Sequence, residues 1–318
     1  MTSKIETDQH SDGAILSRLA EASLTEQRRA RRWNVFFKSL FAAYFFVLIF
    51  MVYLPGDSTE SSGSSKEHTA LVELKGVISS DSEANADTII TGLRAAFKEE
   101  KAKGIILRIN SPGGSPVQSG YINDEIYRLK KKYPEKKLYA VISDICASGG
   151  YYVAAAADEI YADKASVVGS IGVLMNGFGF VDAMKKLGVE RRLYTAGAQK
   201  GFLDPFTEAK PQDIQHIQGL LKNIHQQFID TVRKGRGKRL KENDKLYSGL
   251  IWTGEESIEI GLVDALGSSS YVAREIIKAE KIVDYTPKPN FADRFAERLG
   301  IAFGSSVTSK FFPDSLFQ

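Results

Sequence analysis

The chain has 318 residues, of which 43% are apolar and 25% charged, a composition typical of a globular protein. Its net charge of +3 is too small to indicate nucleic acid as a partner. The single cysteine, Cys146, excludes an intramolecular disulfide framework, and no CxxC, HExxH or Cys/His cluster suggests zinc. We therefore expect no metal and no other cofactor.

The N-terminal segment contains an apolar stretch that predicts a transmembrane anchor. Residues 33–54 are about as long as the ~20 residues that a bilayer core requires. Four arginines lie just before this stretch, within residues 28–32, so the positive-inside rule places the polar tail of residues 1–32 in the cytoplasm. A cleaved signal peptide is the alternative, although its charged region would be unusually long. Residues 55–68, rich in serine, predict a linker to a body outside the cytoplasm.

Beyond the linker, short apolar strands alternate with helical patterns over residues 69–288. Helices that cross between apolar strands favour parallel pairing, so the fold class is predicted to be α/β. Residues 289–318 are weakly patterned, which indicates a C-terminal tail. The predicted strands are residues 69–78, 104–110, 137–143, 159–163, 166–174 and 189–196, and the predicted helices are residues 84–101, 116–132, 149–158 and 213–233.

The stretch DICASGGYY (144–152) places Ser148 between a buried strand and the start of a helix. A helix N-terminus offers free N–H groups, and glycines let a substrate approach the backbone. The Gly149 N–H could then face the oxyanion of a tetrahedral intermediate, with Gly113 or Gly114 of the turn SPGGS (111–115) as the second donor. The alternative is that both glycine pairs only form turns.

A nucleophilic serine needs a base, and several candidates are weak. The GxSxG motif of α/β-hydrolases fails because Cys146 stands where its first glycine belongs. The histidines are scattered, and Cys146 is better explained as a small core residue than as the nucleophile. Lys200, in TAGAQKGFLDPF (195–206), has no acidic residue within three positions. Desolvation can keep a lysine neutral, although an isolated lysine is more often a surface charge.

Four blocks together carry a family resemblance. They are INSPGGS (109–115), DICASGGYYVAAAAD (144–158), SVVGSIGV (166–173) and TAGAQKGFLDPFTE (195–208), in this order. The chain resembles the signal peptide peptidase A family, in its short single-copy form, a family of membrane-anchored Ser/Lys serine proteases. The resemblance covers roughly residues 69–280 and implies that residues 69–288 form a serine protease domain.

The resemblance implies a role for each matched residue. Ser148 corresponds to the nucleophile and Lys200 to the general base. Gly149 and Gly114 correspond to the oxyanion-hole donors, with Gly113 adjacent, and Ser170 to a serine that positions the lysine. The implied fold is similar to the Clp protease subunit and crotonase, with repeated ββα units and a projecting helical arm.

The resemblance also implies the partners and the location. Family members form a homo-oligomeric ring in which the serine of one subunit meets the lysine of its neighbour. Their substrates are remnant signal peptides and other unfolded apolar peptides at the bacterial inner membrane. A related inner-membrane peptidase shares these motifs, so that assignment stays open. A crotonase-type acyl-CoA enzyme, a Clp-like Ser-His-Asp protease and a non-catalytic scaffold are further alternatives.

Overall fold

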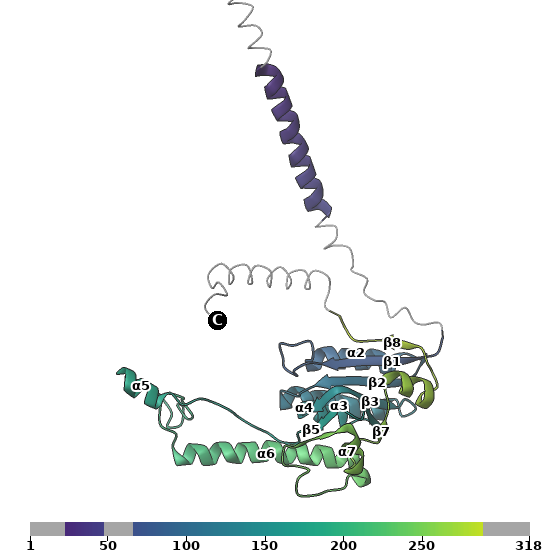
Figure 1. The fold of residues 1–318 in the computed structure, drawn as a ribbon, viewed down its shortest axis with the longest axis vertical. Helices are drawn as coiled ribbons and strands as arrows, with labels where there is room; N and C mark the ends of the chain where they lie inside the picture. The colour runs from purple at the N-terminus through teal and green to yellow at the C-terminus, as the bar shows by residue number, and fades with distance from the viewer. Residues whose placement is uncertain (1–22, 48–65, 289–318) are drawn as a thin grey trace, which may run out of the picture. The chain divides into compact units, whose positions relative to one another are not determined.

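The computed structural model describes residues 23–47 and 66–288 (Figure 1). Residues 23–47 form a helix with exposed side chains. Among the described residues, none of the helices combines the length and the apolarity that a bilayer crossing requires. The predicted tail 1–32, anchor 33–54 and linker 55–68 lie partly outside the described residues, and the predicted tail 289–318 lies wholly outside them.

The folded body belongs to one compact unit, Glu60–Lys288, built on an eight-stranded sheet. The main strand order is β6-β5-β3-β2-β1-β8, and β4 pairs with both β3 and β7. All pairs are parallel except β5 with β6, which confirms the predicted α/β class. The strands are β1 (His68–Lys75), β2 (Ala102–Ser111), β3 (Leu138–Ala147), β4 (Glu159–Ala162), β5 (Val167–Gly169), β6 (Ile251–Thr253), β7 (Ala265–Leu266) and β8 (Ile282–Asp284).

Strand β3 changes its neighbour half-way along its length. Its first half pairs with β4, from Tyr139 to Ile142, and its last residues pair with β5, from Ile145 to Ala147. The other edge of β3 pairs with β2. The apolar run of β3 therefore ends between two neighbours, directly before Ser148.

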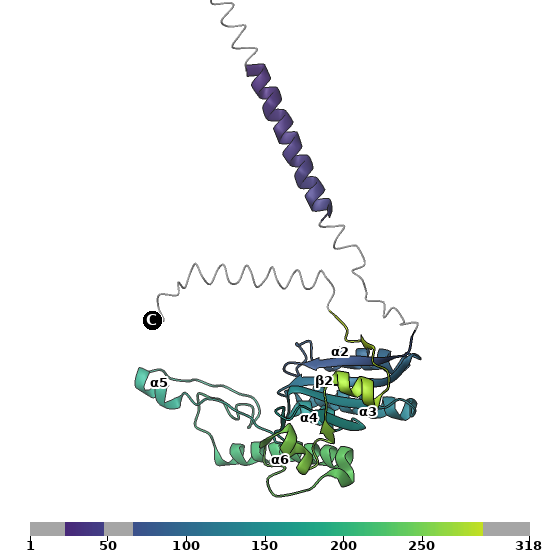
Figure 2. The ribbon, with the colours of Figure 1, turned by 45° about the vertical axis from the view of Figure 1, so that its right-hand side comes forward.

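Helices cover the two faces of the sheet unequally (Figures 1 and 2). The larger core lies on one face, where Leu93, Phe97 and Ile122 of the helices pack on the strands with other apolar side chains. The smaller core on the other face includes Val272 and Ala273. The helical segments are α2 (Ala86–Lys98), α3 (Pro116–Lys132), α4 (Gly149–Ala154), α5 (Val181–Leu187), α6 (Pro211–Arg236), η1 (Gly237–Arg239), α7 (Gly254–Glu259), α8 (Ser269–Tyr271) and η2 (Val272–Ile276).

Residues 172–210, here called the arm, extend away from the sheet together with α6 (Figures 1 and 2). The arm contains the short helix α5, and most of its side chains are exposed. The prediction of a strand over residues 189–196 was wrong, because this segment has no neighbouring strand to pair with inside the described chain. The other predicted elements are found, with α3 at its predicted bounds and β5 shortened to three residues.

Candidate active site

Ser148 occupies a sharp turn between β3 and α4. Its backbone φ of 52° and ψ of −122° are unusual for a residue with a side chain. Such a conformation costs on the order of 1–3 kcal/mol and persists only where surrounding contacts impose it. One such contact is the hydrogen bond from the Ser148 N–H to the Gly169 carbonyl, over 2.8 Å. The turn presents the hydroxyl at the carboxyl end of the sheet, as a nucleophile requires.

The SPGGS turn packs directly against this serine. A Cβ added to Gly113 would lie 2.6 Å from the Gly149 nitrogen and 2.7 Å from Ser148 Cβ. The turn is held from the other side by Ile78, which donates to the Gly113 carbonyl and accepts from the Ser115 N–H, each over 2.8 Å. Only glycine fits at Gly113, because its φ is +98° and both neighbours are close.

Two backbone N–H groups near Ser148 remain without an acceptor. Among the hydrogen bonds of the described residues, neither Gly114 nor Gly149 donates its N–H. A Cβ added to Gly149 would lie 3.2 Å from the Gly114 nitrogen, so the two glycines are neighbours in space. The Gly113 N–H, in contrast, donates to Ser111 Oγ over 3.1 Å. The arrangement thus offers Gly114 and Gly149 as a pair of donors for an oxyanion.

Ser170 lies beside Ser148 because β5 pairs with the end of β3. The register places Ala147 opposite Gly169, so the residues that follow them, Ser148 and Ser170, lie next to each other. Ser170 also has a positive φ, of 53°, and its N–H donates to the Leu250 carbonyl over 2.7 Å. Strand β5 ends there, which explains why it is shorter than the predicted 166–174.

Ser148 and Ser170 line one cavity of about 770 Å³. Its walls are mainly apolar and come from the start of the arm and from one face of α6. The size and apolarity suit several residues of an extended apolar peptide. The lining includes Gly114, Gly149, Tyr152, Val173, Leu174, Met175, Ile217, Leu220, Leu221, Ile224 and Phe228.

Lys200 is not among the residues that line this cavity. It lies in a turn of the arm, where its N–H donates to the Gly197 carbonyl over 3.1 Å, and it is exposed. One chain therefore brings together Ser148, Ser170, Gly113, Gly114 and Gly149, and it leaves Lys200 in solvent.

The other candidate nucleophile and bases have structural partners. Cys146 is fully buried, and burial raises the pKa of its thiol. His216 packs edge-on against Phe202, and His225 Nε2 lies 3.2 Å from the Ile171 carbonyl oxygen. Neither histidine lines the Ser148 cavity. His68 Nε2 lies 2.9 Å from the Tyr285 hydroxyl at the far end of the sheet.

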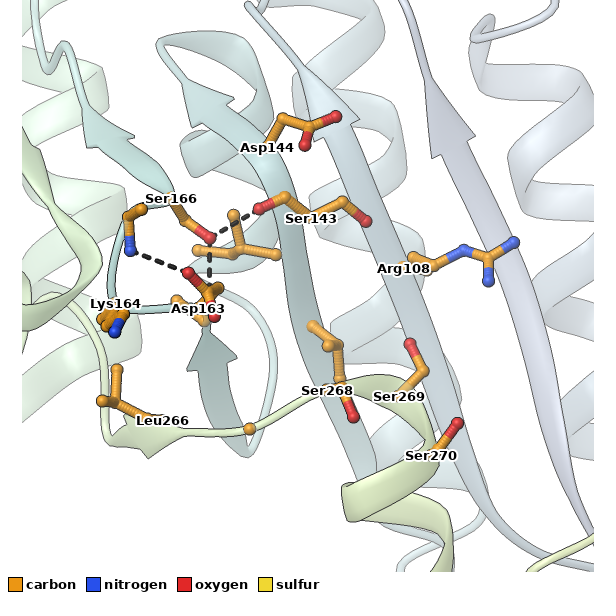
Figure 3. A pocket seen from close by; sticks show the side chains of 15 residues that line it. Arg108, Ser143, Asp144, Asp163, Lys164, Ser166, Leu266, Ser268, Ser269 and Ser270 are labelled. Atoms are coloured by element: carbon orange, nitrogen blue, oxygen red, sulfur yellow. Dashed lines mark hydrogen bonds between the residues drawn. The ribbon is translucent and has the colours of Figure 1, made fainter.

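A second cavity, of about 630 Å³, lies beside the point where β3 changes its neighbour (Figure 3). Ser166 is 2% exposed, donates from Oγ to the Ser143 carbonyl over 2.5 Å, and accepts from the Asp163 N–H over 3.0 Å. Ser268, Ser269 and Ser270 lie on the opposite side. Sequence patterns gave no signal for Ser166, because its role depends on which strand lies next to it.

Comparison with known protein families matches residues 130–283 to peptidase family S49. A protein from Enterococcus faecium that carries the name signal peptide peptidase SppA is 30% identical over 238 residues, which are 72% of this chain and 69% of that protein. The chain belongs to peptidase family S49. The resemblance predicted from the four sequence blocks is thereby confirmed.

Longer relatives match the S49 chain over part of their length. Protease 4 of Haemophilus influenzae is 35% identical over 222 residues, which are 68% of this chain and 35% of that protein. A protein named Na(+)/H(+) antiporter NhaA in Brucella melitensis is 42% identical over 214 residues, 67% of this chain. The chain spans only 29% of that protein. We therefore do not transfer the antiporter name.

Proposed function

We propose that this S49 chain is a serine endopeptidase in which Ser148 is the nucleophile and Lys200 of a neighbouring subunit is the general base. The observation that carries the proposal is the strained turn at Ser148, with two unused N–H groups beside it and an apolar cavity in front. A turn that served only the fold would not need to leave both donors unpaired.

In the proposed reaction, neutral Lys200 Nζ takes the proton of Ser148 Oγ as the oxygen attacks a peptide carbonyl. The carbonyl oxygen becomes an oxyanion that accepts hydrogen bonds from the Gly114 and Gly149 N–H groups; one such donor contributes about 2.7–4 kcal/mol of transition-state stabilisation. The C–N bond then breaks, and the leaving amine takes the proton from Lys200. Water, losing a proton to Lys200, attacks the Ser148 ester, and Ser148 Oγ leaves with that proton.

Exposure of Lys200 supports a site shared between subunits. A lysine acts as a base only when its surroundings exclude water, and the arm of one chain does not provide such surroundings. We propose that chains form a ring in which the arm of one subunit places Lys200 beside Ser148 and Ser170 of the next. A fold of the Clp protease and crotonase type, with the arm as its projection, agrees with the α/β sheet and suits this arrangement.

The apolar cavity supports unfolded apolar peptides as substrates, and we propose remnant signal peptides as the main class. The charge-free residues 39–54 and the arginines before them support a single-pass anchor in the bacterial inner membrane, with the N-terminus cytoplasmic and the catalytic body outside. A related inner-membrane peptidase acting on other membrane or exported peptides is the second candidate, since it would use the same site. No cofactor takes part in the proposed chemistry.

Mixing two inactive variants tests the shared site. Ser148→Ala and Lys200→Ala are each expected to abolish hydrolysis of an apolar reporter peptide. If subunits of the two variants assemble at random, about a quarter of the sites join an intact serine to an intact lysine. The mixture should therefore recover about a quarter of the wild-type activity per site.

The controls separate the possible failures. A mixture of Ser148→Ala with the double variant Ser148→Ala/Lys200→Ala must stay inactive. Labelling of Ser148 by a fluorophosphonate probe reports the nucleophile directly, without a peptide substrate. Full activity of Ser148→Ala would refute Ser148 as the nucleophile, and an inactive mixture of subunits shown to co-assemble would place the base in the same chain as the serine.

A further inference from the structure

Two lysine-rich segments that are distant in the sequence meet on one surface of the body. They are residues 128–137 (RLKKKYPEKK) and 233–245 (RKGRGKRLKENDK). They converge on Tyr127, whose ring centroid lies 5.8 Å from Lys130 Nζ and 4.0 Å from Lys234 Nζ. They also converge on Asp158, because its carboxylate pairs with Lys130 over 2.9 Å and its carbonyl accepts from Arg239 over 2.7 Å.

All four arginines of these segments are paired with carboxylates, but many lysines are not. Arg236, for example, binds both carboxylate oxygens of Asp264 over 2.8 Å. Seven exposed lysines of these segments form no ion pair with any carboxylate in the described part of the chain; six of them lie before Lys245, the last residue of the second segment. We name these six the lysine surface: Lys131, Lys132, Lys137, Lys234, Lys238 and Lys241. Like charges gathered in this way repel one another, and a negatively charged partner would relieve the repulsion.

The lysine surface lies at the N-terminal ends of the parallel strands, where the chain enters the body. Because β1, β2 and β3 are parallel, their first residues lie at the same end of the sheet. At that end the Ile105 N–H donates to the Lys137 carbonyl over 2.9 Å. Strand β1 begins at His68, the last residue of the predicted linker. That linker spans at most about 50 Å when fully extended. Ser148 lies at the opposite, C-terminal end of the strands, directly after the last residue of β3.

We propose that the lysine surface binds the anionic phospholipid headgroups of the membrane to which the chain is tethered. The inference rests on the anchor in the proposed function. A membrane presents many phosphates in one plane, so it can bind six separate ammonium groups at once. Each lysine near an anionic surface adds to the attraction. Nucleic acid is less favoured, because the rings of Tyr127 and Tyr133 already have lysines over them and offer no open stacking face.

The test measures lysine protection in the full chain. The protein is reconstituted into vesicles of phosphatidylcholine alone or mixed with phosphatidylglycerol, and exposed amines are labelled with a membrane-impermeant reagent and quantified by mass spectrometry. We expect labelling of Lys131, Lys132 and Lys234 to slow at least about fivefold with phosphatidylglycerol, and high salt to reverse it. Lys75 and Lys164, exposed at the carboxyl edge of the sheet, serve as internal controls that should not change.

A triple variant tests whether the surface acts as a unit. In Lys131→Gln/Lys132→Gln/Lys234→Gln, the remaining Lys137 and Lys238 should lose their protection, whereas the control Lys75→Gln/Lys164→Gln should keep it. Equal labelling in both kinds of vesicle, with the chain retained, would overturn the docking while leaving the anchor intact. A chain that washes off both vesicles would refute the anchor itself. Protection in detergent without lipid would assign the surface to a protein contact and overturn the lipid proposal.

Discussion

The Ser148 N–H donates to the Gly169 carbonyl over 2.8 Å, so the backbone of the proposed nucleophile is tied directly to strand β5. Ser170 follows Gly169, and its own N–H is fixed by the Leu250 carbonyl over 2.7 Å. The two serines of the site therefore share one backbone frame. Changes that displace β5 should disturb both serines together, even when they lie outside the substrate cavity.

Ser166 sets the position of β5 at its start. We expect Ser166→Ala to reduce kcat about tenfold or more with a smaller change in KM, because the variant loses the hydroxyl bonds that fix the start of β5, and a small displacement of β5 misplaces Ser148 and Ser170. Ser166→Thr keeps the hydroxyl and should restore most of kcat. Steady-state hydrolysis of a reporter peptide measures both constants. A KM effect alone, or no rescue by threonine in a folded variant, would contradict a positioning role.

Gly113 leaves no room for a side chain beside the nucleophile. Gly113→Ala would place a methyl group 2.6 Å from the Gly149 nitrogen at a φ of +98°. We expect kcat to fall at least about a hundredfold, since the Gly149 N–H would be displaced from the oxyanion. Gly120→Ala is the matched control: no heavy atom outside its own helix lies within 4 Å of the added Cβ, and activity should be unchanged. Near-normal kcat in Gly113→Ala would refute this geometry.

The end of α6 is held to the body by a buried ion pair. The Arg236 side chain is 0% exposed and binds Asp264 through two hydrogen bonds of 2.8 Å. Arg236→Met should lower the free energy of unfolding by about 3–5 kcal/mol, because it leaves the carboxylate without its main partner. Arg233→Met breaks the exposed pair with Glu242 and should cost less than about 1 kcal/mol. Denaturant unfolding compares the two, and equal losses would be inconsistent with this assignment.

Glu125 should make the body sensitive to acid. Hydrogen bonds from Arg128 and Arg94, each with a contact of 2.6 Å, lower its pKa from near 4.5 to about 2. A carboxylate whose folded pKa is depressed stabilises the fold above its unfolded pKa, and this stability is lost as the pH falls from about 4.5 to 2. Both arginines are more than half exposed, so screening reduces the loss to about 1–2 kcal/mol.

The measurement for Glu125 is the unfolding midpoint as a function of pH. Glu125→Gln should be less stable than the wild type at neutral pH and should show a shallower decline between pH 4.5 and 2. Parallel curves for the two proteins would show that this carboxylate does not govern the acid response.

Much of the fold follows from local pattern. The apolar runs of β2 and β3 and the proline and lysines that bound α3 specify their elements without reference to distant residues. The pattern failed at two segments: β5 stops at Gly169 because Ser170 adopts a positive φ, and residues 189–196, predicted as a strand, have no strand beside them in the described chain.

The candidate site divides in the same way. The placement of Ser148 between a strand and a helix, and of the SPGGS turn on the next strand, could be predicted because both follow from chain order in a parallel sheet. The sequence could not predict which glycine N–H is free to bind an oxyanion, because this depends on the hydrogen bond that the Gly113 N–H donates to Ser111 Oγ. The pairing of Ser148 with Lys200 stays a prediction, since it requires a second subunit.

The length of β3 sets a distance that any substrate must cover. From Leu138, at the end of the sheet that carries the lysine surface, to Ala147, which precedes Ser148, the strand extends roughly 30 Å, at about 3.3 Å per residue. If the lysine surface binds headgroups and β3 runs along the membrane normal, the hydroxyl of the proposed nucleophile lies about 30 Å from the headgroups. A peptide shorter than about nine extended residues could not be cut while its other end stayed in lipid. Short hydrophobic fragments would have to leave the membrane completely before hydrolysis, so their turnover would include a desorption step that longer peptides avoid.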